Sequence, residues 1–361
     1  MRTRGRRASA GWPAAAEIAA TAISNECLNV SETGAVREAV CRMSEFLINI
    51  SGMGPVAASL ETWASIALAA ALGFVLGFAM NRGSICTVIA TRELVSERRP
   101  ARFIALIECA AWAALVYAIL ETAPMMQEGW SPLGYLIPAA ILLGLGSYVN
   151  GACVFGSVGH IGNGEIGFAF TFFGIYAVLY IESLFDLLSH QPPTSTPPSL
   201  EAALLALVLL AIVALRLGFS RRSESNFRQL TLVMGAIGIT STILAVLAPG
   251  FSITASVGPI ASIPVAGVLI SVCMFGGSIA SARLSKQGFM LKWPTAATIL
   301  KRTLAGILMG LGALLIPGGN DTLLLIGFPI GAWQAALAYV IFVATLAALI
   351  VKFGSMARPW S

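Results

Sequence analysis

The chain has 361 residues, of which 57% are hydrophobic and only 11% are charged, with a net charge of +5; about 25% of the residues in an average soluble domain are charged. A water-soluble globule could not bury so much apolar surface, and a disordered chain would not carry it. The composition therefore excludes a soluble enzyme, a nucleic-acid-binding protein and a fibrous protein, and it predicts a polytopic membrane protein.

The first 60 residues differ from the rest of the chain. They open with MRTRGRR, and the stretch after Pro13 is interrupted by Glu17, so that it makes a poor signal peptide. Met43 opens MSEFLINISG, which reads as a natural start of translation. We treat residues 1–60 as an extension without assigned function, either genuine or the product of a start codon placed too early, and residues 61–355 as the transmembrane domain.

Nine apolar segments follow, each of which could cross the membrane as a helix. A crossing helix needs about 20 apolar residues, and lipid admits only helices or closed barrels. Because the sequence shows no alternating strand pattern, we expect an all-α polytopic fold with about nine transmembrane helices and additional short, broken helices. The segments lie near residues 62–80, 103–123, 133–152, 166–186, 200–219, 229–248, 264–282, 303–317 and 323–350. The last is long enough to be tilted or broken.

Lys and Arg gather in alternate loops. Five arginines follow the first segment, and further basic residues follow the fifth, seventh and ninth, whereas residues 121–132, 183–201 and 249–263 contain no Lys or Arg. Basic loops usually face the cytoplasm. The pattern predicts a multi-pass protein of the bacterial inner membrane with a cytoplasmic C-terminus.

Two pairs of passages are similar and occur in the same order. Residues 73–94 resemble residues 267–288 around a shared GSI core, and residues 136–156 resemble residues 304–324 around a shared GLG step. Such duplication is typical of pseudo-symmetric transporters whose substrate site lies where the repeats meet. The two halves would span about residues 62–190 and 228–355.

Glycine-rich turns in the first half place cysteines at helix breaks. The runs NRGSIC and NGACVFG interrupt apolar segments and leave free N–H groups at the next helix start, where an anion is favoured. Gly83 and Gly151 let the chain turn and let a solute approach the backbone. Cys86 and Cys153 stand at these breaks as weak S–H donors, and Arg82, one helical turn before Cys86, could add a positive charge.

Other polar groups have less specific interpretations. Six cysteines without a CxxC pair, and only two histidines, predict no metal site and no cofactor. Glu108 is expected to pair with an arginine of the preceding loop or to join a proton path. Glu121 and Glu182 are expected to be solvated at the outer interface, and His160 to be a hydrogen-bonded loop residue.

The motifs NRGSIC, GLGSYVNGAC and GLGALLIPGGND resemble the repeated motifs of the YeeE/YedE family of sulfur-transport membrane proteins. The resemblance covers about residues 60–355. It implies a nine-span helical fold with pseudo-symmetric halves, and uptake of thiosulfate or a related sulfur compound relayed by cysteines along a narrow path. The family's cysteine motifs carry over onto Cys86 and Cys153.

The second half departs from the family's pattern. Members commonly place a further cysteine in a GGC turn, but residues 318–321 read GGND. Either Cys273, which otherwise reads as a packing residue, substitutes for that cysteine, or the Asn320 amide and its neighbouring backbone act as donors. Asp321 would repel an anion unless it is protonated or exposed, so another sulfur or selenium species is an alternative substrate.

These observations predict a permease and not an enzyme. It would take up a small inorganic sulfur anion, with thiosulfate the expected substrate, across the lipid bilayer through S–H hydrogen bonds. One alternative is a membrane sulfurtransferase that forms a cysteine persulfide, which would need a thiolate activated by a nearby cation or a helix N-terminus. Another is a membrane anchor for a soluble sulfurtransferase-like partner. No nucleic-acid partner is expected.

Overall fold

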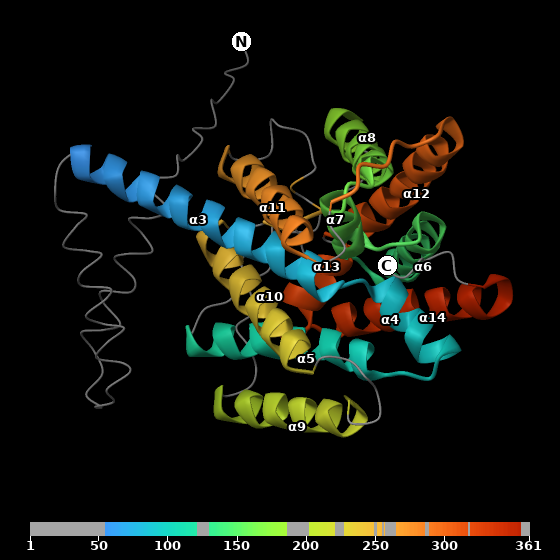
Figure 1. Ribbon diagram of the computed structural model, residues 1–361, viewed down its shortest axis with the longest axis horizontal. Helices are drawn as coiled ribbons and strands as arrows, with labels where there is room; N and C mark the ends of the chain where they lie inside the picture. The colour runs from blue at the N-terminus through green and yellow to red at the C-terminus, as the bar shows by residue number, and fades with distance from the viewer. Residues whose placement is uncertain are drawn as a thin grey trace, which may run out of the picture. The chain divides into compact units, whose positions relative to one another are not determined.

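The computed structural model divides the chain into two units, Met1–Ile66 and Ala67–Ser361, and all side chains discussed below belong to the second (Figure 1). Residues 1–54, including the extension expected before residue 61, lie outside the described residues. The structure describes residues 55–120, 130–185, 202–220, 227–248, 251–254, 256, 265–285, 289–316 and 318–354.

The described residues are helical apart from turns and one isolated β-bridge between Glu165 and Lys292. The helices are α3 (Pro55–Gly83), α4 (Thr87–Ser96), α5 (Ala101–Ile119), α6 (Leu133–Asn150), α7 (Val154–Gly162), η1 (Ile166–Phe168), α8 (Ala169–Phe185), α9 (Ala202–Ser220), α10 (Phe227–Leu247), α11 (Val265–Leu284), α12 (Ala296–Leu315), α13 (Asn320–Thr322), η3 (Leu323–Gly327) and α14 (Trp333–Phe353).

The expected all-α, multi-pass membrane architecture is confirmed. Among the described residues, eight helical segments are long and apolar enough to cross a membrane, and they coincide with eight of the nine expected spans. The remaining expected span, residues 200–219, coincides with α9, whose apolar run Leu207–Arg216 is shorter.

The last expected span is broken. A short helical piece, α13 with η3, ends at Gly327, and α14 begins only at Trp333. Pro329 in the intervening turn has no N–H to donate, and Gly331 adopts a left-handed φ of +73°. By contrast, α12 begins seven residues earlier than expected, at Ala296, because the Thr295 hydroxyl caps its first turn.

One pair of similar passages folds alike, and the other does not. Gly151 (φ +75°) follows α6 two residues before Cys153, and Gly318 (φ +80°) follows α12 two residues before Asn320. In the other pair, the chain breaks after Gly83, whereas α11 continues through its GGSI run without a break.

Close helix packing explains the unbroken α11. A Cβ atom on Gly277 would overlap the carbonyl oxygen of Phe74 on α3, and a Cβ on Gly77 would overlap that of Met274 on α11. Small residues of this kind let helices in a membrane approach backbone to backbone. In the same way α12 packs against α6 and α8, and α5 against α9 and α10 (Figure 1).

We expect Gly277→Ala to lower the melting temperature in detergent, because the added methyl group would overpack the α3–α11 contact at a cost of about 1–3 kcal/mol. The neighbouring Gly276→Ala is the matched control, since a Cβ there meets no other atom within 4 Å, and alanine favours a helix by about 1 kcal/mol. Thermal unfolding followed by tryptophan fluorescence compares the two variants. Equal melting temperatures would contradict the packing argument.

Candidate functional site

The structure brings together the two cysteines at the glycine-rich breaks. Cys86 is the N-cap residue of α4, and Cys153 is the N-cap residue of α7; both are fully buried. The backbone N–H of Cys153 donates to Cys86 Sγ over 3.4 Å, and the N–H of Thr87 donates to Cys153 Sγ over 3.4 Å. Each sulfur thus accepts a hydrogen bond from the start of the other cysteine's helix.

Local turns direct both cysteines inward. After Gly83 the chain passes through Ser84 with a left-handed φ of +48°, and the Arg102 guanidinium holds this turn by donating to the Ser84 carbonyl over 3.0 Å. On the other side, Gly151 takes the left-handed conformation that allows the chain to leave α6 and begin α7 at once. Gly151 therefore makes its turn, as expected. At the first break Ser84 takes the left-handed conformation instead of Gly83, which ends α3 and packs closely against Val233.

The cysteine pair has closely packed surroundings. A Cβ atom on Gly156 would lie 2.7 Å from Cys86 Sγ, so only glycine leaves room for this sulfur against α7. The Thr87 hydroxyl is 3.4 Å from the Tyr339 hydroxyl of α14. The cysteine pair therefore lies in a buried setting that contains several hydrogen-bond donors. These donors are the two thiols, the hydroxyls of Thr87 and Tyr339, and the N–H groups at the starts of α4 and α7. Groups of this kind can donate to an anion.

The expected position of Arg82 is wrong. Arg82 does not lie one helical turn before Cys86, because α3 ends at Gly83 and Ser84 takes a left-handed φ between the two residues. The Arg82 side chain is exposed, and its carbonyl accepts a hydrogen bond from Gln229 over 3.4 Å. Within the described part of the chain, no hydrogen bond or ion pair joins Arg82 to Cys86.

The two candidates for the missing third cysteine differ in their surroundings. Cys273 lies half-buried on α11, and no hydrogen bond among the described residues connects it with Cys86 or Cys153. Asn320 is fully buried at the start of α13, which contacts α7, the helix that begins after Cys153. Neither polar atom of its side-chain amide has a hydrogen-bond partner among the described residues. Asn320 thus keeps free donor capacity beside the cysteine helix.

Asp321 is neither exposed nor free to face an anion. Its Oδ2 accepts hydrogen bonds from the N–H groups of Ile253 (2.7 Å) and Thr254 (3.3 Å), and its Oδ1 accepts one from the Thr254 hydroxyl (2.8 Å). Three donors from one loop therefore compensate its charge. The repulsion expected from the sequence is weakened by this loop.

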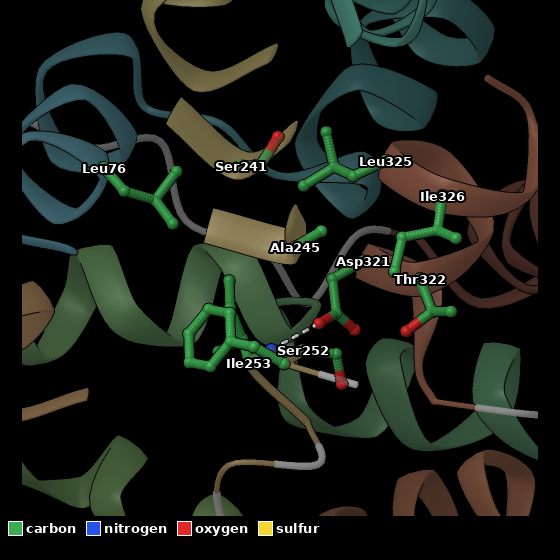
Figure 2. A pocket seen from close by; sticks show the side chains of 10 residues that line it. Leu76, Ser241, Ala245, Ser252, Ile253, Asp321, Thr322, Leu325 and Ile326 are labelled. Carbon is green, nitrogen blue, oxygen red and sulfur yellow. Dashed lines mark hydrogen bonds between the residues drawn. The ribbon is translucent and has the colours of Figure 1, made fainter. Parts of the chain in front are cut away.

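Beside Asp321 lies a small pocket with an empty volume of about 310 Å³, part of which is open to the surroundings (Figure 2). Its walls come from α3, α10, the loop after α10 and the α13–η3 segment. The hydroxyl of Thr322 in this wall is buried without a hydrogen-bond partner among the described residues. The lining residues are Leu76, Ser241, Ala245, Phe251, Ser252, Ile253, Asp321, Thr322, Leu325 and Ile326.

Glu108 pairs with a residue that the sequence analysis missed. Its Oε2 lies 2.6 Å from Nη1 of Arg216 on α9, and both side chains are buried. The expected arginine partner in the preceding loop is therefore wrong. Arg216 also donates to the hydroxyl of Thr231 on α10. The signal was an arginine inside an otherwise apolar segment, which requires a partner in lipid.

The remaining polar expectations have mixed outcomes. Glu182 is buried, only 6% exposed, so its expected solvated position is wrong; Glu121 lies outside the described residues. His160 is hydrogen-bonded, as expected, since its Nδ1 lies 3.0 Å from Oε2 of Glu165, but it lies in the last turn of α7 and not in a loop. This hydrogen bond from His160, assisted by Lys292, lowers the pKa of the Glu165 carboxyl to about 2, so that the carboxylate stays charged.

We expect Gly156→Ala to push the Cys86 side chain out of its place, because the new methyl group would meet both its sulfur and its Cβ. In a variant that keeps only Cys86 and Cys153, the thiols should then react several-fold faster with N-ethylmaleimide. Gly134→Ala, where a Cβ meets nothing within 4 Å, is the control. Unchanged labelling in Gly156→Ala would show that the cysteines do not pack as described.

Comparison with known proteins gives two matches. The profile of the family described as "Sulphur transport" matches residues 82–228 and again residues 195–348, which together cover more than half of the chain. The protein named thiosulfate transporter TsuA, from Spirochaeta thermophila, is 25% identical over 325 residues, which cover 78% of this chain and 98% of that protein.

Proposed function

This chain belongs to the sulphur-transport family, as its motifs suggested, and we propose that it is a permease of the bacterial inner membrane that takes up thiosulfate. The observation that carries this proposal is the meeting of Cys86 and Cys153 at the starts of α4 and α7. The similarity to a protein named thiosulfate transporter supports the choice of substrate.

An anion can replace each cysteine sulfur as the acceptor of a backbone N–H hydrogen bond. In the resting arrangement the Thr87 and Cys153 N–H groups donate to uncharged or weakly accepting sulfur atoms. A thiosulfate oxygen or terminal sulfur accepts the same N–H groups more strongly, because hydrogen bonds to an ion are about twice as strong as neutral ones. The released thiols then rotate and donate their S–H groups to the anion. Neither α4 nor α7 has an acidic residue in its first turn to oppose this.

The path to the cysteines runs past Asn320. The pocket beside Asp321 is bounded by residues 251–253, which belong to a stretch without Lys or Arg that we assign to the outer face, with the C-terminus cytoplasmic. Asn320 lies next to this pocket in sequence, on a segment that contacts α7. Its amide N–H groups, which have no partner among the described residues, support a role as the donor in place of the cysteine of the family's GGC motif. Thiosulfate would then pass from pocket to Asn320 to the cysteine pair.

A sulfurtransferase is the alternative. A persulfide-forming cysteine needs a nearby cation or a helix N-terminus to stabilise its thiolate; the Arg82 side chain expected as the cation is exposed, but both cysteines stand at helix starts. The choice of a permease is therefore supported by the family and by the similarity to a protein named thiosulfate transporter. Uptake of an anion into a negative interior costs about 2.3 kcal/mol per charge for each 100 mV. The permease therefore needs a concentration gradient, a coupled ion or a soluble sulfurtransferase-like partner that consumes the substrate.

We expect Cys86→Ala and Cys153→Ala each to reduce the initial rate of labelled-thiosulfate uptake at least about tenfold, because each removes one donor from the path, at a cost of about 1.4 kcal/mol or more. The measurement uses a bacterium without its own sulfate and thiosulfate uptake systems, at matched membrane levels. Cys109→Ala, on α5 and apart from the pair, should retain uptake. A well-expressed wild type without uptake would overturn thiosulfate as the substrate; cysteine variants that retain it would overturn the site.

Two substitutions of Asn320 are expected to affect thiosulfate uptake differently. Asn320→Leu keeps the branched shape of the side chain but removes both N–H donors, so we expect a rise in the KM for thiosulfate. Asn320→Cys restores a weak donor at the same place and should keep substantial uptake. The same uptake assay over a range of thiosulfate concentrations measures both. Equal KM values for Asn320→Leu and the wild type would exclude Asn320 from the path.

A further inference from the structure

The side-chain amide of Asn150 is completely hydrogen-bonded and 1% exposed. Its Oδ1 accepts from the Thr171 hydroxyl (2.7 Å) and from Nη1 of Arg302 (2.9 Å). Its Nδ2 donates to the Ala152 carbonyl (2.8 Å) and to the Ser157 hydroxyl (2.9 Å). An amide has two donor and two acceptor positions, so every position is used and the amide can adopt no second orientation without losing bonds.

Both donor bonds of Asn150 end at the turn that carries Cys153. Ala152 immediately precedes Cys153, and the Ser157 hydroxyl in turn donates to the Cys153 carbonyl over 3.0 Å. The amide therefore fixes the backbone on each side of Cys153. This backbone determines where the Cys153 N–H points, and it points at Cys86 Sγ. The geometry of the cysteine pair thus depends on an amide that does not touch either sulfur.

Arg302 connects the same turn with the second half of the chain. It stands on α12, 152 residues after Asn150, and its guanidinium carbon lies 3.6 Å from the centre of the Phe168 ring. The His160 ring is stacked on Phe168 at 4.2 Å with an angle of 2° between the planes. Two groups this close to one ring must occupy opposite faces. Through Asn150 and Phe168, Arg302 therefore supports both the start of α7 and its last turn, which holds His160.

We propose that Asn150 and Arg302 are positioning residues of the transport site, which hold the Cys153 thiol in register with Cys86 and link its helix to α12. The inference deepens the proposed function, on which its transport readout rests. Arg302 polarises the amide through Oδ1 and so strengthens the two donor bonds on the opposite side. A lysine cannot replace it, because only the planar guanidinium can stack on a ring while it donates in its own plane.

Two variants separate the contacts. Asn150→Asp keeps an oxygen for Thr171 and Arg302 but loses both donors to the Cys153 turn, and it faces the Ala152 carbonyl with a second oxygen. Arg302→Lys keeps the charge and loses the stacking. The control is Arg283→Lys, which removes a guanidinium that lies over the Phe289 ring at 5.4 Å, at the end of α11.

The first readout needs no transport. With Cys153 as the only cysteine, its rate of reaction with a small methanethiosulfonate reagent in membranes should change at least about threefold in Asn150→Asp and Arg302→Lys, and not in Arg283→Lys. If the two residues act as one unit, the double variant should be no worse than the more severe single variant. Unchanged rates, or effects that simply add, would overturn the proposal.

The second readout is thiosulfate uptake in the otherwise unaltered chain. We expect the KM to rise about tenfold in Asn150→Asp with a largely retained maximal rate, as for the loss of a binding contact. A merely structural role would instead lower the amount of folded protein and leave the KM unchanged, and that result would overturn the proposal. If the reactivity of Cys153 changes as expected while the wild type fails to carry thiosulfate, the proposed substrate fails and the positioning role stands.

Discussion

A backbone N–H group inside a membrane must find a partner within the protein, because lipid offers none. At the starts of α4 and α7 that requirement is met by sulfur: the N–H groups of Thr87 and Cys153 donate to the two cysteines across the junction. Sulfur is a weak acceptor, so these bonds satisfy the backbone without holding it firmly. In the proposed function, these N–H groups are the donors that a stronger acceptor would take from sulfur. The Asn150 hydrogen bonds fix the backbone that carries one of them.

The two similar passages 136–156 and 304–324 contain the same left-handed glycine turn in different surroundings. In the first, a left-handed glycine leads to Cys153 and into α7; in the second, it leads to Asn320 and Asp321 and into a short helix. The first turn is held rigidly by the saturated Asn150 amide. The second is tied through Asp321 to the loop after α10, while the Asn320 amide has no hydrogen-bond partner in the described part of the chain. The same glycine turn therefore leads to a fully hydrogen-bonded backbone beside Cys153 and to a loop-bound carboxylate beside Asn320.

Much of the fold could be predicted from the sequence, because span length and apolar composition are local properties that lipid enforces. The cysteine breaks could also be predicted, since NRGSIC and NGACVFG contain the glycines that end the helices. The side-chain partners could not. The prediction for Arg82 assumed one continuous helix from Arg82 to Cys86, but Ser84 has a left-handed φ and interrupts it. The hydrogen bond between Asn150 and Arg302 joins residues that are 152 positions apart in the sequence. Such contacts follow from how α6 and α12 pack, which no short motif encodes.

The buried pair of Glu108 and Arg216 also constrains how the protein is made. Either helix alone, α5 or α9, would place an uncompensated charge in lipid, at a cost of about 2.5–3.5 kcal/mol on insertion scales. In the described part of the chain α6, α7, η1 and α8 lie between α5 and α9, so the Glu108 carboxyl is synthesised well before its partner. Once α9 is in place, the Glu108–Arg216 pair joins α5 to α9, and the bond from Arg216 to the Thr231 hydroxyl joins α9 to α10.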